Sequence, residues 1–230
     1  MEQSAKAVED GIEITPISHA TMILKIGNQV IYTDPLGGTD AFKGQPIPDI
    51  ILLTDIHPDH LDAETLRSIS KEDAIIVVPQ AVKDELPDGM PGIVVVMANG
   101  EKNIQKGIEI EAIPMYNVPE APDSRHTKGR GNGYVISFEA KRVYIAGDTS
   151  ATPEMKALRD IDIAFIPMNL PYTMGVEEAA EGVVAFKPKI VHPYHYRTPT
   201  GLSDINKFKE LVNAKDPNIQ VDLLNFYPEI

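Results

Sequence analysis

One short stretch of the sequence concentrates side chains that bind metal ions. Residues 54–62, Thr-Asp-Ile-His-Pro-Asp-His-Leu-Asp, place Asp55, His57, Asp59 and His60 within six positions. The stretch directly follows a wholly apolar run of four residues, which predicts a turn at the carboxyl end of a buried strand. In such a turn, imidazole nitrogens and carboxylate oxygens can converge on one divalent cation or on two neighbouring ones. We therefore interpret the stretch as the centre of a metal site rather than as a polar turn with solvated charges.

Three further side chains have a similar placement later in the chain. His126 lies in a long polar loop over residues 116–132, Asp148 follows an apolar strand in Ala-Gly-Asp-Thr, and His195 follows another in His-Pro-Tyr-His-Tyr. Taken singly, they can be a solvated loop histidine, a helix cap and a polar strand end. Open sheets, however, usually place their sites beyond the carboxyl ends of their strands. The recurrence of such groups at strand ends favours one common site.

Short strands and helices must position these groups. Apolar periodicity predicts strands over residues 12–17, 21–26, 29–33, 50–53, 74–78, 93–97, 108–115, 134–138, 142–146, 161–166, 189–192 and 219–224, and helices over 62–70, 80–86, 153–159, 176–186 and 203–212. Hairpins mixed with strand–helix alternation indicate an α/β protein with two mixed β-sheets packed together and helices on the outer faces. We expect residues 1–10 to be a flexible tail and residues 11–230 to form a single domain.

The composition excludes several classes of function. The 230 residues include 21 Lys and Arg against 34 Asp and Glu, so the formal net charge is −13, which disfavours binding to nucleic acid and to anionic membranes. The absence of cysteine excludes disulfides, thiolate metal ligands and a cysteine nucleophile. Neither a signal peptide nor an apolar run of about 20 residues is found. We expect a cytoplasmic protein that acts on a small molecule without membrane insertion; a homo-oligomer stays open.

Together these motifs resemble the metallo-β-lactamase fold hydrolases, and most of all the branch with the ascorbate-6-phosphate lactonase and the N-acylphosphatidylethanolamine phospholipase D. The family carries His-x-His-x-Asp-His, then a His, an Asp (often in Gly-Asp-Thr) and a last His. The matching residues here are His57, Asp59, His60, His126, Asp148 and His195. Asp34, in Thr-Asp-Pro, matches the family's early Asp, and the resemblance extends from about residue 12 to residue 227. It implies the four-layer αββα sandwich of that family.

The resemblance also implies a dinuclear centre of two divalent metal ions. Asp55, His57 and His126 are expected to hold the first ion and Asp59, His60 and His195 the second, with Asp148 bridging them. A hydroxide bridging the ions would attack the substrate, and Asp59, the expected catalytic residue, would orient the attacking water. Asp34 is expected to support the ligands from behind, and His19, which follows a strand in Ser-His-Ala, is either a second such residue or an ordinary packed histidine.

One departure from the family concerns the identity of the metal. The first histidine of the family motif is Asp55 in this chain, a harder and negatively charged ligand. Zinc remains the first expectation, but three carboxylates among the seven ligands shift the preference toward manganese or iron. The substitution also leaves open a metal-binding protein with a degenerate site and no hydrolytic turnover. A di-iron oxidoreductase is the third reading, and metal stoichiometry and iron content separate the three.

Loops near the candidate ligands suggest the substrate class. Arg125, Lys128 and Arg130 surround His126 in the sequence and can bind a phosphate or carboxylate through charge-assisted bonds, although a solvated loop explains them nearly as well. Asn169 and Tyr172, in a segment after another strand, are expected to supply polar contacts to the substrate. We expect hydrolysis of a small anionic ester or lactone first, and of a phosphodiester next.

Overall fold

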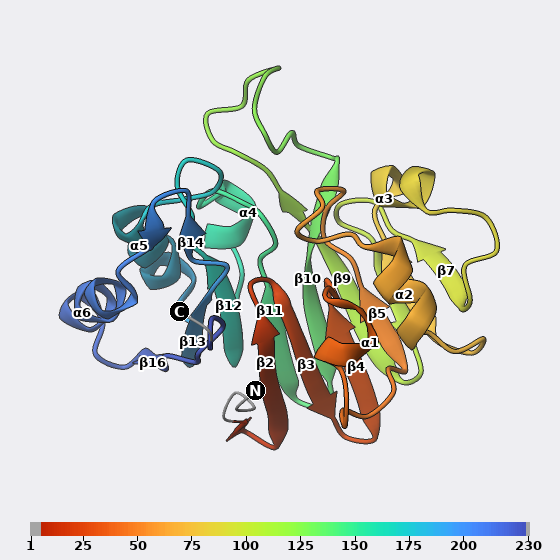
Figure 1. Cartoon of the computed structure of the whole chain (residues 1–230). Coiled ribbons are helices and arrows are strands. Elements are labelled where there is room, and N and C mark those ends of the chain that lie inside the picture. Colours follow the sequence, from red (N-terminus) through yellow and green to blue (C-terminus); the bar gives the residue numbers. More distant parts are fainter. Residues whose placement is uncertain (1–5, 229–230) are drawn as a thin grey trace.

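The computed structural model describes residues 6–228, and two seven-stranded mixed sheets form its centre (Figure 1). The first sheet contains, in spatial order, β1 (Ala7–Glu9), β2 (Ile12–Ser18), β3 (Thr21–Ile26), β4 (Gln29–Thr33), β5 (Ile50–Leu52), β6 (Ile75–Val78) and β7 (Ile93–Val96). The second contains β16 (Gln220–Val221), β13 (Ile190–Tyr194), β12 (Ile163–Pro167), β11 (Lys141–Ile145), β10 (Gly131–Phe138), β9 (Ile108–Met115) and β8 (Lys102–Gln105). A small hairpin pairs β14 (Arg197–Thr198) with β15 (Gly201–Leu202).

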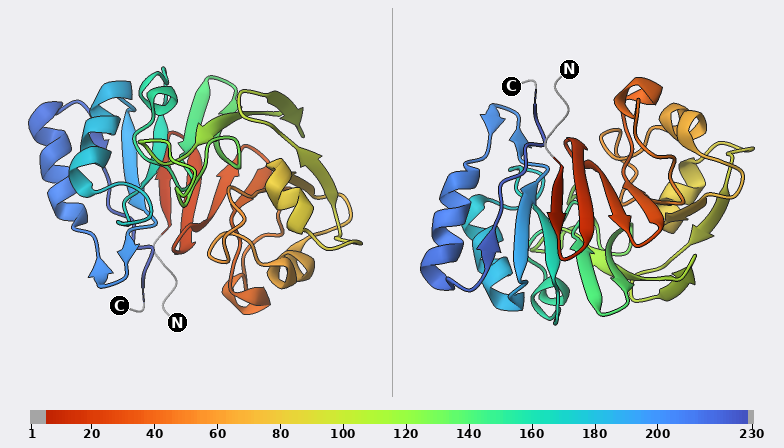
Figure 2. Two further views of the ribbon diagram at one scale, coloured as in Figure 1. Left: turned by 90° about the horizontal axis from the view of Figure 1, so that it is seen from above. Right: turned by 90° about the horizontal axis from the view of Figure 1, so that it is seen from below.

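Helices cover the outer faces of both sheets. They are α1 (Gly38–Ala41), α2 (Ala63–Ile69), α3 (Gln80–Glu85), α4 (Pro153–Lys156), α5 (Val176–Phe186) and α6 (Ile205–Lys215). Figure 2 shows α2 and α3 on one side of the paired sheets and α5 and α6 on the opposite side. The structure therefore confirms the predicted αββα sandwich with two mixed sheets.

The strand β5 shows how the sequence produces these layers. Ile50, Ile51 and Leu52 are all fully buried, which is the pattern of a strand covered on both faces. Successive side chains of a strand point to opposite faces. Ile51 accordingly packs with Leu66 of α2 and Val82 of α3, whereas its two neighbours belong to the core between the sheets. The wholly apolar run thus places β5 at the centre of the sandwich.

A few elements differ from the sequence-based prediction. Within the predicted N-terminal tail, residues 7–9 form β1, which pairs antiparallel with β2; residues 1–5 lie outside the described residues. The pairing partner lies nearby in the sequence, but three residues give no clear periodicity. The edge strand β8 was also missed, because three of its four side chains are polar and none is buried. The last predicted strand, residues 219–224, is reduced to Gln220–Val221.

The parallel strands bring their carboxyl ends to one edge of the sandwich. β4, β5, β6 and β7 run parallel in the first sheet, as do β11, β12, β13 and β16 in the second. The segments that follow β5, β11 and β13 meet at this edge. Over residues 6–228, none of the helices has the length and apolar character required to cross a membrane.

Gly133 provides a test of the packing between β10 and β11. A Cβ atom at this position would lie 2.7 Å from the carbonyl oxygen of Ala146 and 2.9 Å from that of Ile145. Because both neighbours are backbone atoms, they cannot move aside cheaply. We expect Gly133→Ala to lower the free energy of unfolding by about 1–3 kcal/mol. Urea denaturation measures the change, and the matched variant Ser137→Ala, at a half-buried position of the same strand, should stay within about 0.5 kcal/mol of the wild type.

Candidate metal centre

The turn between β5 and α2 presents four of the predicted ligands. It begins at a fully buried strand, and it ends at Asp62, which caps α2 by accepting from the backbone N–H groups of Glu64 and Thr65. Inside the turn, the backbone N–H of His60 donates to the carbonyl of His57 over 2.9 Å. The turn is therefore fixed at both ends and braced in the middle, so its side chains have defined directions.

The first group of potential ligands contains Asp55, His57 and His126, whose ligand atoms lie within 4.8 Å of one another. The Oδ2 atom of Asp55 is 2.5 Å from Nδ1 of His57 and 3.6 Å from Nε2 of His126. The His126 ring is oriented by its Nδ1, which donates to the carbonyl oxygen of Tyr172 over 3.1 Å. Because Nδ1 carries the proton, the neutral ring presents the lone pair of Nε2 to the carboxylates. The structure thus brings together the three residues predicted for one metal ion.

The second group contains His60, Asp148 and His195, again within 4.8 Å of one another. The Nε2 atoms of the two imidazoles are 3.2 Å apart, and they lie 3.3 and 3.4 Å from Oδ1 of Asp148. His60 is oriented from behind by Asp34, whose Oδ2 is 2.8 Å from its Nδ1. Asp34 in turn accepts from the hydroxyl and the backbone N–H of Thr54. Asp34 therefore lies where the sequence expected it, behind a ligand rather than among them.

Asp148 joins the two groups. Its Oδ1 atom faces the rings of His60 and His195, and its Oδ2 atom lies 3.2 Å from Nε2 of His126. One carboxylate thus directs each of its oxygens to a different cluster of imidazoles. This is the arrangement expected of a residue that bridges two cations.

The charges and the unpartnered atoms of the site fit divalent metal ions. Among the buried side chains of residues 6–228, Nε2 of His126 and Oδ1 of Asp148 have no hydrogen-bond partner. Burial opposes the charged form of His60, but the Asp148 and Asp34 carboxylates raise its pKa well above the usual range. Buried polar atoms without partners are costly, and a cation bound between them would remove that cost. Imidazole and carboxylate donors suit zinc, manganese or iron.

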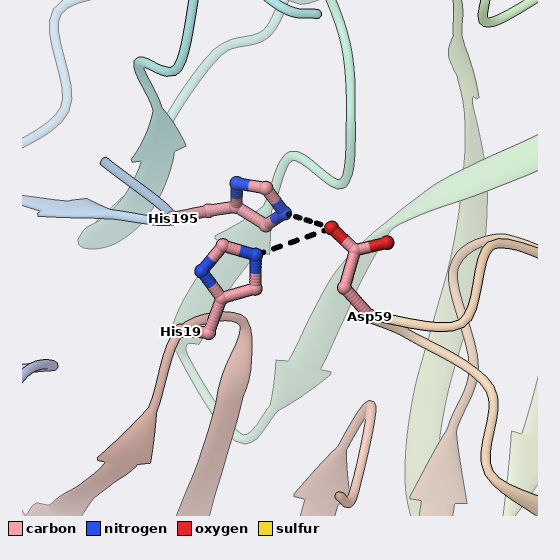
Figure 3. Close-up of side chains that lie close together, drawn as sticks. All are labelled: His19, Asp59 and His195. Carbon is pink, nitrogen blue, oxygen red and sulfur yellow. Dashed lines mark hydrogen bonds and ion pairs between the residues drawn. The ribbon is translucent and has the colours of Figure 1, made fainter. Parts of the chain in front are cut away.

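Asp59 was expected to share an ion with His60 and His195. Its Oδ2 atom groups with His195 and, in place of His60, with His19, at 3.5 Å and 3.2 Å from their Nε2 atoms (Figure 3). Its side chain is 44% exposed, whereas His60 and His195 are fully buried. Burial acts to raise the pKa of Asp59, yet the hydrogen bonds from His19 and His195 hold it far below its usual range. Asp59 is thus an ionised carboxylate at the open side of the centre.

His19 is more closely involved than a supporting residue needs to be. Its ring lies against that of His195, with centroids 3.8 Å apart and planes tilted by 39°, and its Nδ1 atom lies 2.6 Å from the hydroxyl of Tyr227. The same hydroxyl oxygen accepts from the backbone N–H of Arg197, which leaves the phenolic proton for His19. Because Nδ1 of His19 accepts a hydrogen bond from the Tyr227 hydroxyl, the ring carries its own proton on Nε2, which donates to Asp59. Sequence reasoning missed Tyr227, because a tyrosine 208 residues away gives no local signal.

Three residues at this edge adopt left-handed backbone conformations. His19, Asp34 and His195 have φ angles of 55°, 41° and 47°, which non-glycine residues adopt at a cost. The backbone N–H of His195 donates to the carbonyl of His19 over 3.3 Å, and that of Asp34 donates to the carbonyl of Leu52 over 3.0 Å. The surrounding strands therefore hold these residues in conformations that direct their side chains toward the centre.

The residues predicted to bind substrate are only partly available. Arg125 is exposed above the ring of Tyr172 at 4.8 Å, but Lys128 pairs with Glu154 at 2.6 Å. Asn169 is buried, and its Oδ1 atom accepts from the hydroxyl of Thr173. This hydrogen bond joins two residues four positions apart in the same loop. The side-chain oxygen of Asn169 is therefore engaged in holding the loop together.

A cavity of about 310 Å³ opens beside the centre. It is lined by Asn117, Glu120, Ala121, Pro122, Ser124, His126, Thr127 and Lys128. His126 is the residue that the cavity shares with the candidate metal ligands. The long loop that precedes β10 thus forms both a wall of the cavity and one side of the centre.

Comparisons with known proteins find relatives of this chain in both sequence and structure. A family model described as a beta-lactamase superfamily domain matches residues 13–195. The UPF0173 metal-dependent hydrolase of Thermococcus onnurineus is 31% identical over 213 residues, which cover 89% of this chain and 93% of that protein. The corresponding protein of Lysinibacillus sphaericus is 30% identical over 218 residues, with coverages of 90% and 96%. The crystal structure of a candidate metal-dependent hydrolase from Parabacteroides distasonis superposes with a TM-score of 0.84 at 37% identity, covering 98% of this chain and 99% of that one.

Proposed function

This chain belongs to the metallo-β-lactamase superfamily and is a metal-dependent hydrolase, and from that premise we propose that it cleaves a small anionic ester or lactone at a dinuclear centre. The observation that carries the proposal is the position of Asp148, whose two oxygens face His126 on one side and His60 with His195 on the other. A single carboxylate between two imidazole clusters supports two ions rather than one.

The proposed ligands fall into two sets. Asp55, His57 and His126 hold one ion, His60 and His195 hold the other, and Asp148 is shared. Divalent metal ions supply Lewis acidity at such a site, which makes a water molecule more acidic and polarises the bond to be cleaved.

Asp59 is the residue proposed to orient the attacking water. Its carboxylate is the most exposed of the acidic groups at the centre, and the ring nitrogens of His19 and His195 approach only its Oδ2 atom. The other oxygen points away from both rings (Figure 3). An ionised carboxylate with one oxygen anchored and the other accessible can accept a hydrogen bond from water and hold it in one direction.

The cavity beside His126 supports a small substrate. Its volume of about 310 Å³ lies at the lower end of the range of roughly 300–1,000 Å³ found for small-molecule sites. Arg125, exposed at the neighbouring ring of Tyr172, and Lys128 at the cavity wall are the cations that favour an anionic group. Glu154 neutralises Lys128 in part, so a substrate with one carboxylate fits better than one with a doubly charged phosphate.

Metal removal tests this function. Metal analysis of the untreated protein should give two equivalents of metal per chain. A screen of lactones, carboxylic esters, thioesters and phosphodiesters should show hydrolysis of a carboxylate-bearing lactone or ester. We expect a chelator to abolish this hydrolysis and added zinc or manganese to restore it, since the ligand set has no other means to activate water. Hydrolysis that persists in metal-free protein would contradict the proposal. Turnover of phosphodiesters alone would change the substrate class, and iron with oxygen consumption would indicate an oxidoreductase.

A further inference from the structure

Asp55 is bound by an arginine as well as by the histidines of its group. Nε of Arg130 donates to Oδ1 of Asp55 over 3.2 Å, and Nη2 donates to Oδ2 over 3.0 Å. The carboxylate is fully buried and the arginine side chain is 21% exposed. The two residues are 75 positions apart, and Arg130 immediately precedes β10. This is a two-bond, fork-like ion pair at the edge of the candidate metal centre.

The pair leaves Asp55 able to bind a cation. An ionised carboxylate offers about four lone-pair positions, and Arg130 occupies one on each oxygen. The Oδ2 atom that accepts from Arg130 is also the atom that faces His57 and His126, at 2.5 Å and 3.6 Å. One oxygen thus serves both the arginine and the ligand group.

The pair also changes the charge that the centre receives from this position. Asp55 replaces the first histidine of the family motif, and alone it would add a negative charge to a site that already contains the buried carboxylates of Asp148 and Asp34. Arg130 cancels that charge. Together the two side chains present a single donor atom with no net charge, which is what a neutral imidazole presents.

We propose that Asp55 and Arg130 act as one unit that replaces the first histidine of the motif, with Arg130 as a positioning residue that orients and neutralises a metal-binding carboxylate. This inference rests on the proposed dinuclear centre. It removes Arg130 from the cations available to the substrate, because both nitrogens that face the centre are engaged. A purely structural ion pair is a weaker explanation, since buried ion pairs contribute little net stability.

A double-mutant cycle on metal affinity tests the unit. The full-length chain, freed of metal, is titrated with zinc against a chromophoric chelator, and the affinity for the second equivalent is compared among the wild type, Asp55→His, Arg130→Gln and the double variant. Asp55→His alone should weaken that affinity about tenfold or more, because it leaves an unpaired guanidinium beside a dication. Adding Arg130→Gln should recover most of the loss. Arg130→Gln alone should shift the preference from zinc toward manganese, because the carboxylate then carries its full charge.

Control variants separate the outcomes. Arg142→Gln removes an arginine that pairs with Glu111 at 3.7 Å, away from the centre. It should leave the affinity for the second equivalent of zinc, and that for manganese, unchanged. Arg130→Lys keeps the charge but loses the fork, and should stay closer to the wild type than Arg130→Gln. Equal affinities for Asp55→His and the double variant, or a wild type that binds one equivalent only, would overturn the unit. Binding of two equivalents without any hydrolysis would instead overturn the proposed function and leave the unit standing.

Discussion

Asp148→Asn is expected to lose metal from both ligand groups and to lose nearly all hydrolytic activity. The carboxylate lies 3.2–3.4 Å from Nε2 of His126, His60 and His195, so that an asparagine removes the one negative charge shared by all three. We expect metal affinity to fall by more than the roughly 10–100-fold that loss of a supporting partner costs. Metal content after dialysis and kcat/KM in the presence of added metal measure the two effects.

A second buried aspartate serves as the control for Asp148→Asn. Asp162 is also buried, accepts from the backbone N–H of Arg142 and pairs with Lys189 at 2.6 Å, away from the centre. Asp162→Asn should lower stability while keeping the metal content of the wild type. If Asp148→Asn retained two equivalents and measurable turnover, the bridging role would be wrong.

Asp59→Asn is expected to lower kcat by about 10²–10⁴-fold, the usual contribution of a positioned acid–base group. In contrast to Asp148, this variant should retain metal, because Asp59 does not belong to the group formed by His60, Asp148 and His195. Its carboxylate is also the most exposed of the ligand candidates, so the substitution leaves no buried group without a partner. Single-turnover kinetics together with metal analysis separate loss of chemistry from loss of metal.

Asp62, three positions later, offers a matched control for Asp59. It caps α2, and asparagine caps a helix about as well as aspartate, so Asp62→Asn should change neither kcat nor stability appreciably. A parallel loss of metal and kcat in Asp59→Asn would show that Asp59 acts as a ligand, as the family resemblance implies. Full activity in that variant would exclude both roles.

The sandwich itself could be predicted from the sequence because its signals are local. The apolar run at residues 50–53 predicted a strand buried on both faces, and the apolar spacing over residues 62–70 predicted a helix directly after the turn. These two features alone place four polar side chains at the edge of a central strand. The order of the later groups, each just beyond a strand, then predicted a common site, and the structure brings His126, Asp148 and His195 there.

Other relations depended on contacts between distant segments. His19 was expected behind the ligands, yet its contacts with Asp59 and Tyr227 span 40 and 208 positions. The loop cations are a second example, because all three were candidates for the substrate until the fold paired Lys128 with Glu154 and Arg130 with Asp55. All three side chains carry a positive charge and lie within six positions of the same loop, so the sequence offered no means to distinguish them.

The sequence by itself determined which residues bring chemistry to the edge of the sheets, since residue type and strand periodicity are properties of neighbours along the chain. The tertiary structure decided which oxygen faces which nitrogen. Whether Asp59 groups with His60 or with His19, and whether Arg130 meets a substrate or Asp55, depends on differences of a few Å in the path of loops that join separate strands. Those paths follow from the packing of the whole sandwich.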